Sequence, residues 1–241
     1  MSRIVVFGAG GRAGRTAVAE ALRRGHTVTA VVRDPASHQD LAELDAAGTS
    51  GPGGTAGSDT DTGADTGAGA GAAAGGGLSV VAGDVLDAAS VAKAAAGTDA
   101  AIVAAADLSI PARDFFGRAA RAVGTGLAEA GVRRVVYVGI ASLLPGKDGV
   151  ALLDDPGFPA EHREFSLGHA AGLEALRETS LDWLYISPAG DFDHDGERAG
   201  SYRLTDHGDW ESRLSYPDFA IALLDEIDEP AHRGVHLAIT S

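Results

Sequence analysis

The chain contains no cysteine among its 241 residues. This absence excludes disulfides, thiolate nucleophiles and cysteine-ligated metal centres. Lysine is almost as scarce, because Lys93 and Lys147 are the only two in the chain. The sequence also lacks an apolar run near the roughly 18 residues of a membrane-spanning helix. Because strand-like residues begin near residue 3, there is no room for a signal peptide, and we expect a soluble, cytoplasmic protein.

Positive charge is also in short supply. The chain has 19 lysines and arginines against 34 aspartates and glutamates, which gives a net charge of −15. Such a surface argues against nucleic acid or an anionic membrane as a partner. A small anionic ligand would need local devices, namely a helix N-terminus and a few placed arginines. We therefore expect a small-molecule partner, while composition leaves the oligomeric state open.

One segment has almost nothing to bury. Residues 48–77 contain only Gly, Ala, Ser, Thr, Asp and Pro, and they hold twelve of the chain's 34 glycines. Without larger apolar side chains, this segment cannot offset the entropy lost on ordering. We predict a disordered insertion within a single domain that spans residues 1–241.

Outside this insertion, apolar runs with strand character alternate with helical patterns. The predicted strands are residues 3–7, 26–32, 78–82, 99–106, 134–139, 181–187 and 235–239. One predicted helix directly follows the first glycine cluster. The others cover residues 37–47, 90–96, 113–130, 164–179 and 215–226. This alternation predicts an α/β fold with a doubly wound, mainly parallel sheet.

The chain is organised around the stretch from Arg3 to Thr16, in which a strand meets a glycine cluster and a helix follows. Two spacings fit it. Gly8-x-Gly10-x-x-Ala13 matches the dinucleotide fingerprint with alanine last, and Gly8-x-x-Gly11-x-x-Gly14 matches the looser spacing of extended short-chain dehydrogenases. With either spacing, a pyrophosphate would lie against the turn at residues 8–14 and the helix N-terminus.

Several further stretches complete a resemblance to a known family. They are Val31–Pro35, Gly83–Val85, Arg133–Val138, Leu181–Pro188, Gly200–Arg203 and Ser215–Asp218. Together with the glycine turn, they resemble the atypical short-chain dehydrogenase/reductases. The most similar branch binds NAD(P)H and includes proteins designated NADH-flavin reductases, biliverdin reductase B and repressor-like proteins of nitrogen metabolism. The resemblance implies a single Rossmann-type domain with a small C-terminal substrate-side region.

The predicted cofactor residues follow the ends of the strands. Arg33 ends the second strand, where an arginine favours the 2′-phosphate of NADP over NAD. Arg12, in the glycine turn, could hold the same phosphate. The resemblance places Asp84 and Val85 at the adenine edge. Asp84 could also cap the next helix without any ligand, and both roles can hold at once.

Ala104, Ala105 and Ala106 end the fourth predicted strand, and such small residues would allow the nicotinamide ribose to lie close to the backbone. Pro188 follows the sixth predicted strand, where the resemblance implies a loop beside the nicotinamide. Asp191, Asp193, His194 and Asp195 resemble metal ligands in composition alone, and we expect no metal there.

The expected catalytic pair of the family is missing. Ser142 follows the fifth strand, where short-chain dehydrogenases have a catalytic serine. The accompanying Tyr-x-x-x-Lys pair, which protonates a substrate oxygen, is absent. That spacing is filled instead by Phe165 and His169, or by Ser166 and Ala170 in the adjacent register. His169 could donate a proton, since histidine titrates near neutral pH.

Three functions remain compatible with these features. The first is an NADPH-preferring reductase acting on a flat, conjugated acceptor of the flavin or quinone type, which needs no positioned proton donor. The second is a non-catalytic protein that senses NADP(H). The third, less compatible with the missing pair, is an isomerase or dehydratase.

Overall fold

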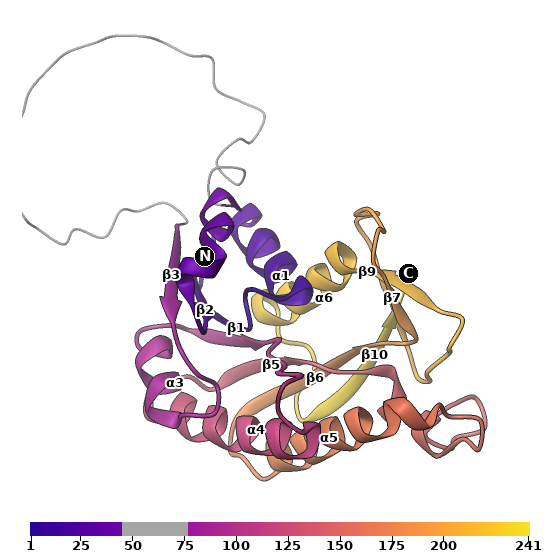
Figure 1. The fold of residues 1–241 in the computed structure, drawn as a ribbon. Coiled ribbons are helices and arrows are strands. Elements are labelled where there is room, and N and C mark those ends of the chain that lie inside the picture. Colours follow the sequence, from indigo (N-terminus) through magenta and orange to yellow (C-terminus); the bar gives the residue numbers. More distant parts are fainter. Residues whose placement is uncertain (45–76) are drawn as a thin grey trace, which may run out of the picture.

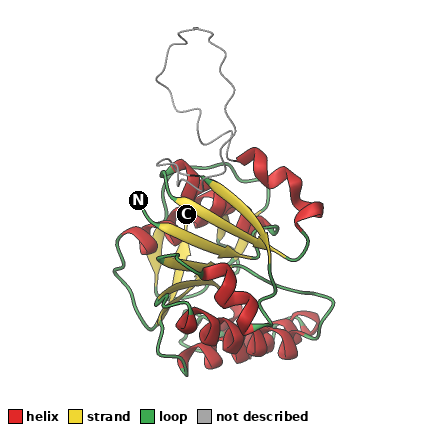
Figure 2. Ribbon diagram, turned by 90° about the vertical axis from the view of Figure 1, so that its left-hand side faces the viewer, coloured by secondary structure: helices red, strands yellow, loops and turns green. Residues whose placement is uncertain are grey.

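The computed structural model describes residues 1–44 and 77–241. The predicted insertion, residues 48–77, lies outside the described residues except for Gly77. Figure 1 shows a central sheet with helices on both faces, and Figure 2 shows the same layers from the side. The order of the strands is β3-β2-β1-β4-β5-β6-β10-β8, and all neighbours are parallel except β10 and β8. The predicted Rossmann-type fold class is therefore confirmed.

The strands of the main sheet are β1 (Arg3–Phe7), β2 (Thr27–Val32), β3 (Leu78–Ala82), β4 (Ala100–Val103), β5 (Arg134–Val138), β6 (Asp182–Pro188), β8 (Arg203–Thr205) and β10 (Val235–Thr240). A separate pair, β7 (Asp191–Asp193) and β9 (Arg213–Ser215), lies beside this sheet in the C-terminal part. The inner strands are apolar without alternation because helices cover both of their faces.

The helices form two layers. α1 (Arg12–Arg23) packs on α6 (Tyr216–Asp228) over one face of the sheet. α4 (Ala112–Glu129) packs between α3 (Ala88–Ala95) and α5 (Ala160–Arg177) over the other. Each layer closes its own apolar cluster, with Phe219 fully buried in the first and Leu127 in the second. None of the helices in the described ranges is both long and apolar enough to cross a membrane.

The structure corrects several predicted boundaries. β4 ends at Val103, because residues 104–106 leave the sheet and line a cleft beside the glycine turn. The segment after β2 is a 3₁₀ helix, Pro35–Ala42, and α5 begins at Ala160. The short strands β7 and β9 were not predicted, because three residues are too few to show a periodic pattern.

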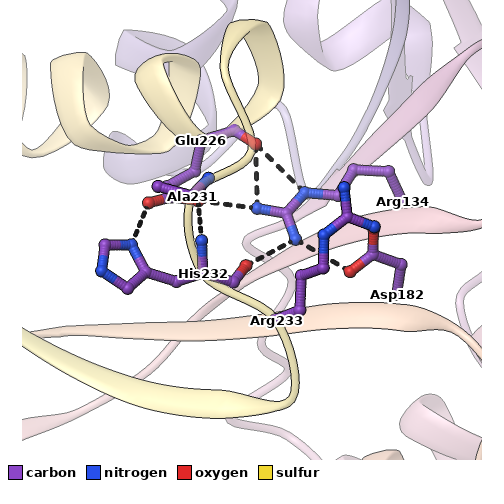
Figure 3. A network of polar contacts seen from close by, with 6 residues as sticks. All are labelled: Arg134, Asp182, Glu226, Ala231, His232 and Arg233. Atoms are coloured by element: carbon purple, nitrogen blue, oxygen red, sulfur yellow. Dashed lines mark hydrogen bonds and ion pairs between the residues drawn. The ribbon is translucent and has the colours of Figure 1, made fainter.

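A buried ion network closes the edge of the sheet where β5 and β6 begin (Figure 3). The guanidinium of Arg134 donates to the carboxylate and backbone carbonyl of Glu226 at 2.9 and 2.8 Å, and to Asp182 at 3.2 Å. Glu226 also accepts from the backbone amides of Ala231 and His232. This network ties the end of α6 and the loop before β10 to the sheet.

Removing one partner from this network should strongly destabilise the fold. Glu226→Ala would leave the Arg134 charge buried with fewer partners, and we expect a loss of about 3–5 kcal/mol in the free energy of unfolding. Glu164→Ala is the matched control, because Glu164 pairs with Arg113 at an exposed site and should contribute at most about 1 kcal/mol. Urea denaturation of both variants measures the difference, and equal losses would contradict a special role for the buried network.

Candidate functional site

A cleft of about 380 Å³ opens at the carboxyl ends of the first four strands of the main sheet. Its walls come from the glycine turn, from the segments after β2, β3 and β4, and from the start of α4. β2 and β4 flank β1, so the chain crosses the sheet in opposite directions from this point. Open parallel sheets bind ligands where the strand order reverses in this way.

The glycine turn requires glycine at two positions because the backbone is too close for a side chain. Gly8 has φ +78, and a Cβ on it would lie 2.6 Å from the backbone of Ala104. A Cβ on Gly14 would lie 2.2 Å from the carbonyl oxygen of Gly8. The close approach at Gly14 gives a role to the last glycine of the spacing Gly8-x-x-Gly11-x-x-Gly14. Gly11 is the N-cap of α1 and makes no side-chain capping bond, so this helix presents its first amides as dinucleotide-binding turns do.

Most of the predicted cofactor residues line this one cleft. They are Gly8, Gly10, Gly11, Arg33, Asp84, Val85, Ala104, Ala105 and Ala106. Arg12, Ala13 and Gly14 form the first turn of α1 beside it. Pro188 instead lies at the end of β6, opposite Ile239 of β10 and apart from the cleft. The cofactor-binding roles of all these residues remain predictions.

Two charged side chains that line the cleft form an ion pair. Arg33 follows β2, and its Nη1 donates to the carboxylate of Asp107 in the loop between β4 and α4. The other oxygen of Asp107 accepts from the amide and the hydroxyl of Ser109 at 2.9 and 2.6 Å. The bonds from Ser109, with Arg33 nearby, hold the pKa of Asp107 below its usual range. Asp107 is therefore an oriented anion in the wall of the cleft.

The segment after β3 tests one of the two predicted roles of Asp84, that of helix cap. The N-cap of α3 is Asp87, whose carboxylate accepts from the amide of Ala89, so the alternative in which Asp84 caps this helix is wrong. Asp84 accepts instead from the amide of Leu86 at 2.8 Å and closes a tight turn on the cleft wall.

Sequence reasoning missed five further residues that line the cleft, namely His38, Leu86, Asp107, Ile110 and Phe115. A Cβ on Gly10 would lie 2.2 Å from Nε2 of His38, so this ring rests directly on the glycine turn. The ring is oriented by a bond between Nδ1 and the carbonyl of Asp34, at 2.9 Å. No spacing in the sequence pointed to His38, because it is the fold of the 3₁₀ segment that brings it back over the turn.

The two predicted catalytic residues lie outside the lining of the 380 Å³ cleft. Ser142 is buried, and its hydroxyl donates to that of Ser166 in α5 at 2.8 Å. His169 is also buried, and its Nδ1 is bonded to the Tyr185 hydroxyl at 2.7 Å. The rings of Phe116 and Phe165 pack against the His169 imidazole, at 3.8 and 4.8 Å between centroids.

A much smaller cavity of about 20 Å³ adjoins His169. Tyr137, Tyr185 and Ala105 also line it, and Ala105 is shared with the large cleft. The Tyr137 hydroxyl is buried there without a hydrogen-bond partner among the residues that the structure describes. The cavity could hold about one water molecule and is lined mostly by apolar atoms, so it is too small to be a pocket for a ring.

Burial lowers the pKa of His169 to about 3, with a smaller contribution from His236. His169 is therefore a neutral imidazole at neutral pH and cannot act as a cationic acid. Within residues 1–44 and 77–241, no three His, Cys, Asp or Glu side chains lie close enough together to hold a metal ion.

The buried neutral His169 should make folding sensitive to mild acid. The unfolded chain takes up a proton near the reference pKa of about 6.5, whereas folded His169 stays neutral, so stability falls as the pH drops below about 6.5. We expect a loss of up to about 2 kcal/mol from His169 between pH 7.5 and pH 5. Denaturation at both pH values should show this loss reduced in His169→Leu.

His162→Leu is the control, because His162 is exposed on the same helix. It should keep the wild-type pH dependence. A His169→Leu variant with the wild-type dependence would contradict the assigned burial effect.

The glycine turn, the helix N-terminus and the cleft at the strand-order reversal define a Rossmann-type dinucleotide-binding protein. The sequence profile of a family described as NAD(P)H-binding matches residues 68–230, which is more than half of the chain. The chain belongs to this NAD(P)H-binding family of atypical short-chain dehydrogenase/reductases.

Solved structures of similar proteins agree with this assignment. A "putative exported protein" from Burkholderia pseudomallei is 29% identical over all of both chains, with a TM-score of 0.75. A "putative NADH-flavin reductase" from Streptococcus pneumoniae TIGR4 is 26% identical over all of both chains, with a TM-score of 0.71. A "putative epimerase" from Bacteroides thetaiotaomicron is 27% identical over 99% of this chain and 96% of its own, with a TM-score of 0.74.

Proposed function

We propose that the protein is an NADPH-preferring reductase that delivers hydride to a flat, conjugated acceptor of the flavin or quinone type. The observation that carries this proposal is that α5 lacks the proton-donating tyrosine and the lysine that related enzymes have in this helix. Phe165 and His169 have that spacing here, and they pack together with Phe116 in one aromatic cluster. His169 is neutral, and Ser142 is engaged with Ser166.

The cleft fits a nicotinamide dinucleotide. Gly8 and Gly14 allow a close backbone approach, and the N-terminus of α1 offers amides to a pyrophosphate. Arg33 supplies a cation at the end of β2, where the adenosine ribose lies in this fold. When bound, the cofactor supplies a hydride from C4 of its nicotinamide ring. The chain's own contribution is to hold and orient that ring beside Ala105.

The acceptor must accommodate two electrons without a strong positioned acid. A ketone would develop an alkoxide, which needs a proton donor within hydrogen-bonding reach. A flavin or quinone spreads the new charge over its ring system, and solvent can supply the proton. The name of the Streptococcus pneumoniae protein, which refers to NADH and flavin, supports this class of acceptor. In this function Ser142 and His169 at most polarise the acceptor.

The decisive experiment is NADPH oxidation with riboflavin, FMN, menadione and cyclohexanone as acceptors. We expect oxidation that depends on a flavin or quinone and is negligible with cyclohexanone.

Ser142→Ala and His169→Ala should slow NADPH oxidation by less than the 10²–10⁴-fold typical of positioned proton transfer. Ala105 lines both cavities, so Ala105→Trp should fill the space for the nicotinamide and abolish NADPH oxidation. Ala96→Trp is the control, because Ala96 is exposed at the opposite end of the strands, and it should leave NADPH oxidation unchanged. Tight NADPH binding without turnover on any acceptor would instead support a sensor of NADP(H).

Cofactor preference provides a separate prediction. A hydrogen bond to a charged group contributes about 1.5–3 kcal/mol, so the Arg33 contact should favour NADPH over NADH by roughly ten- to hundredfold. Dissociation constants for both cofactors should show this ratio reduced in Arg33→Ala and retained in Arg113→Ala, which removes an exposed arginine on α4. If Arg33→Ala keeps the wild-type ratio, Arg33 does not recognise the 2′-phosphate.

A further inference from the structure

The ion pair between Arg33 and Asp107 crosses the binding cleft. Arg33 follows β2 and Asp107 lies beyond β4, while β1 runs between these two strands. Both side chains line the cleft that begins with the glycine turn after β1. The pair therefore links the two walls on either side of the turn, at the end of the cleft where Arg33 would meet the adenosine ribose.

The two partners are held very differently. The side chain of Arg33 is 69% exposed, whereas that of Asp107 is 10% exposed. Ser109 fixes the Asp107 carboxylate through two hydrogen bonds, so the carboxylate keeps its position when Arg33 moves. Asp107 engages one terminal nitrogen of a guanidinium that carries five N–H donors. The arginine is the adaptable member of the pair and the aspartate is the fixed one.

The fixed carboxylate has opposite consequences for the two cofactors. The 2′-phosphate of NADPH would have to share Arg33 with an anion, and it would lie close to a second negative charge. The 2′-hydroxyl of NADH is neutral and can donate a hydrogen bond to a carboxylate, as ribose hydroxyls do in NAD-selective proteins. Asp107 should therefore favour NADH, whereas Arg33 favours NADPH.

We propose that Asp107 is a second cofactor-selecting residue, which opposes Arg33 and narrows the preference for NADPH. This inference rests on the proposed binding of NAD(P)H in the 380 Å³ cleft. Selection of the ribose substituent then depends on a pair of side chains from two different strand ends rather than on Arg33 alone.

Asp107→Asn tests the proposal with little change of shape. The amide oxygen of asparagine can still accept from the amide and the hydroxyl of Ser109, but the negative charge is lost. The matched control is Asp99→Asn. Asp99 pairs with Arg3 at the opposite end of β4, so this substitution removes the same charge far from the cleft. Thermal unfolding should show that both variants are folded.

We expect Asp107→Asn to tighten NADPH binding and weaken NADH binding, each by about three- to tenfold. Asp99→Asn should leave both dissociation constants at their wild-type values. In the Arg33→Ala background, Asp107→Asn should improve NADPH binding less, because there is no guanidinium to release.

Two outcomes would overturn the proposal in distinguishable ways. If the wild type binds NADPH in an Arg33-dependent manner but Asp107→Asn keeps the wild-type ratio of the two dissociation constants, only the role of Asp107 is wrong. If the wild type binds neither dinucleotide, the proposed function is wrong as well.

Discussion

The close packing of backbone on backbone at the glycine turn is the constraint on which the rest of the site depends. Gly8 lies against the main chain of Ala104, and Gly14 lies against the carbonyl of Gly8. These contacts leave no space for a Cβ, so β1, the start of α1 and the end of β4 form one rigid corner. Every other wall of the cleft is positioned relative to this corner, including the Asp107 carboxylate, which follows the alanines that end β4.

The two ends of the sheet serve different purposes. At the amino ends of β5 and β6, Arg134, Glu226 and Asp182 satisfy one another in a buried network. At the carboxyl ends, the Asp107 carboxylate at the cleft pairs with Arg33, whose side chain is mostly exposed. Because removing one partner of a buried ion pair destabilises the whole fold, the network at the amino ends is suited to holding the fold together. The second end retains charges that a ligand can engage.

The interior behind Ala105 lacks the proton-donating pair that the family resemblance implies. His169 lies at the spacing of the family's catalytic lysine, yet it is enclosed by Phe116 and Phe165 and is neutral. The nearby Tyr137 hydroxyl is buried in a gap of about 20 Å³. Space and acidity at this point are thus both limited, and the proposal of a delocalised acceptor rests on these two limits.

The sequence by itself determined the alternation of strands and helices, the glycine turn and most of the cleft lining, because these features are local in the chain. A strand reaching Gly8 and a helix beginning after Gly11 can be recognised from neighbouring residues alone. The sequence could not determine that His38 covers Gly10, that Asp107 meets Arg33, or that Asp87 rather than Asp84 caps α3. Only the tertiary structure decided these contacts, because side-chain direction in a loop depends on packing against segments distant in the chain. The same reason explains His169, whose low pKa results from its burial and, to a smaller extent, from His236, neither of which its position along the helix reveals.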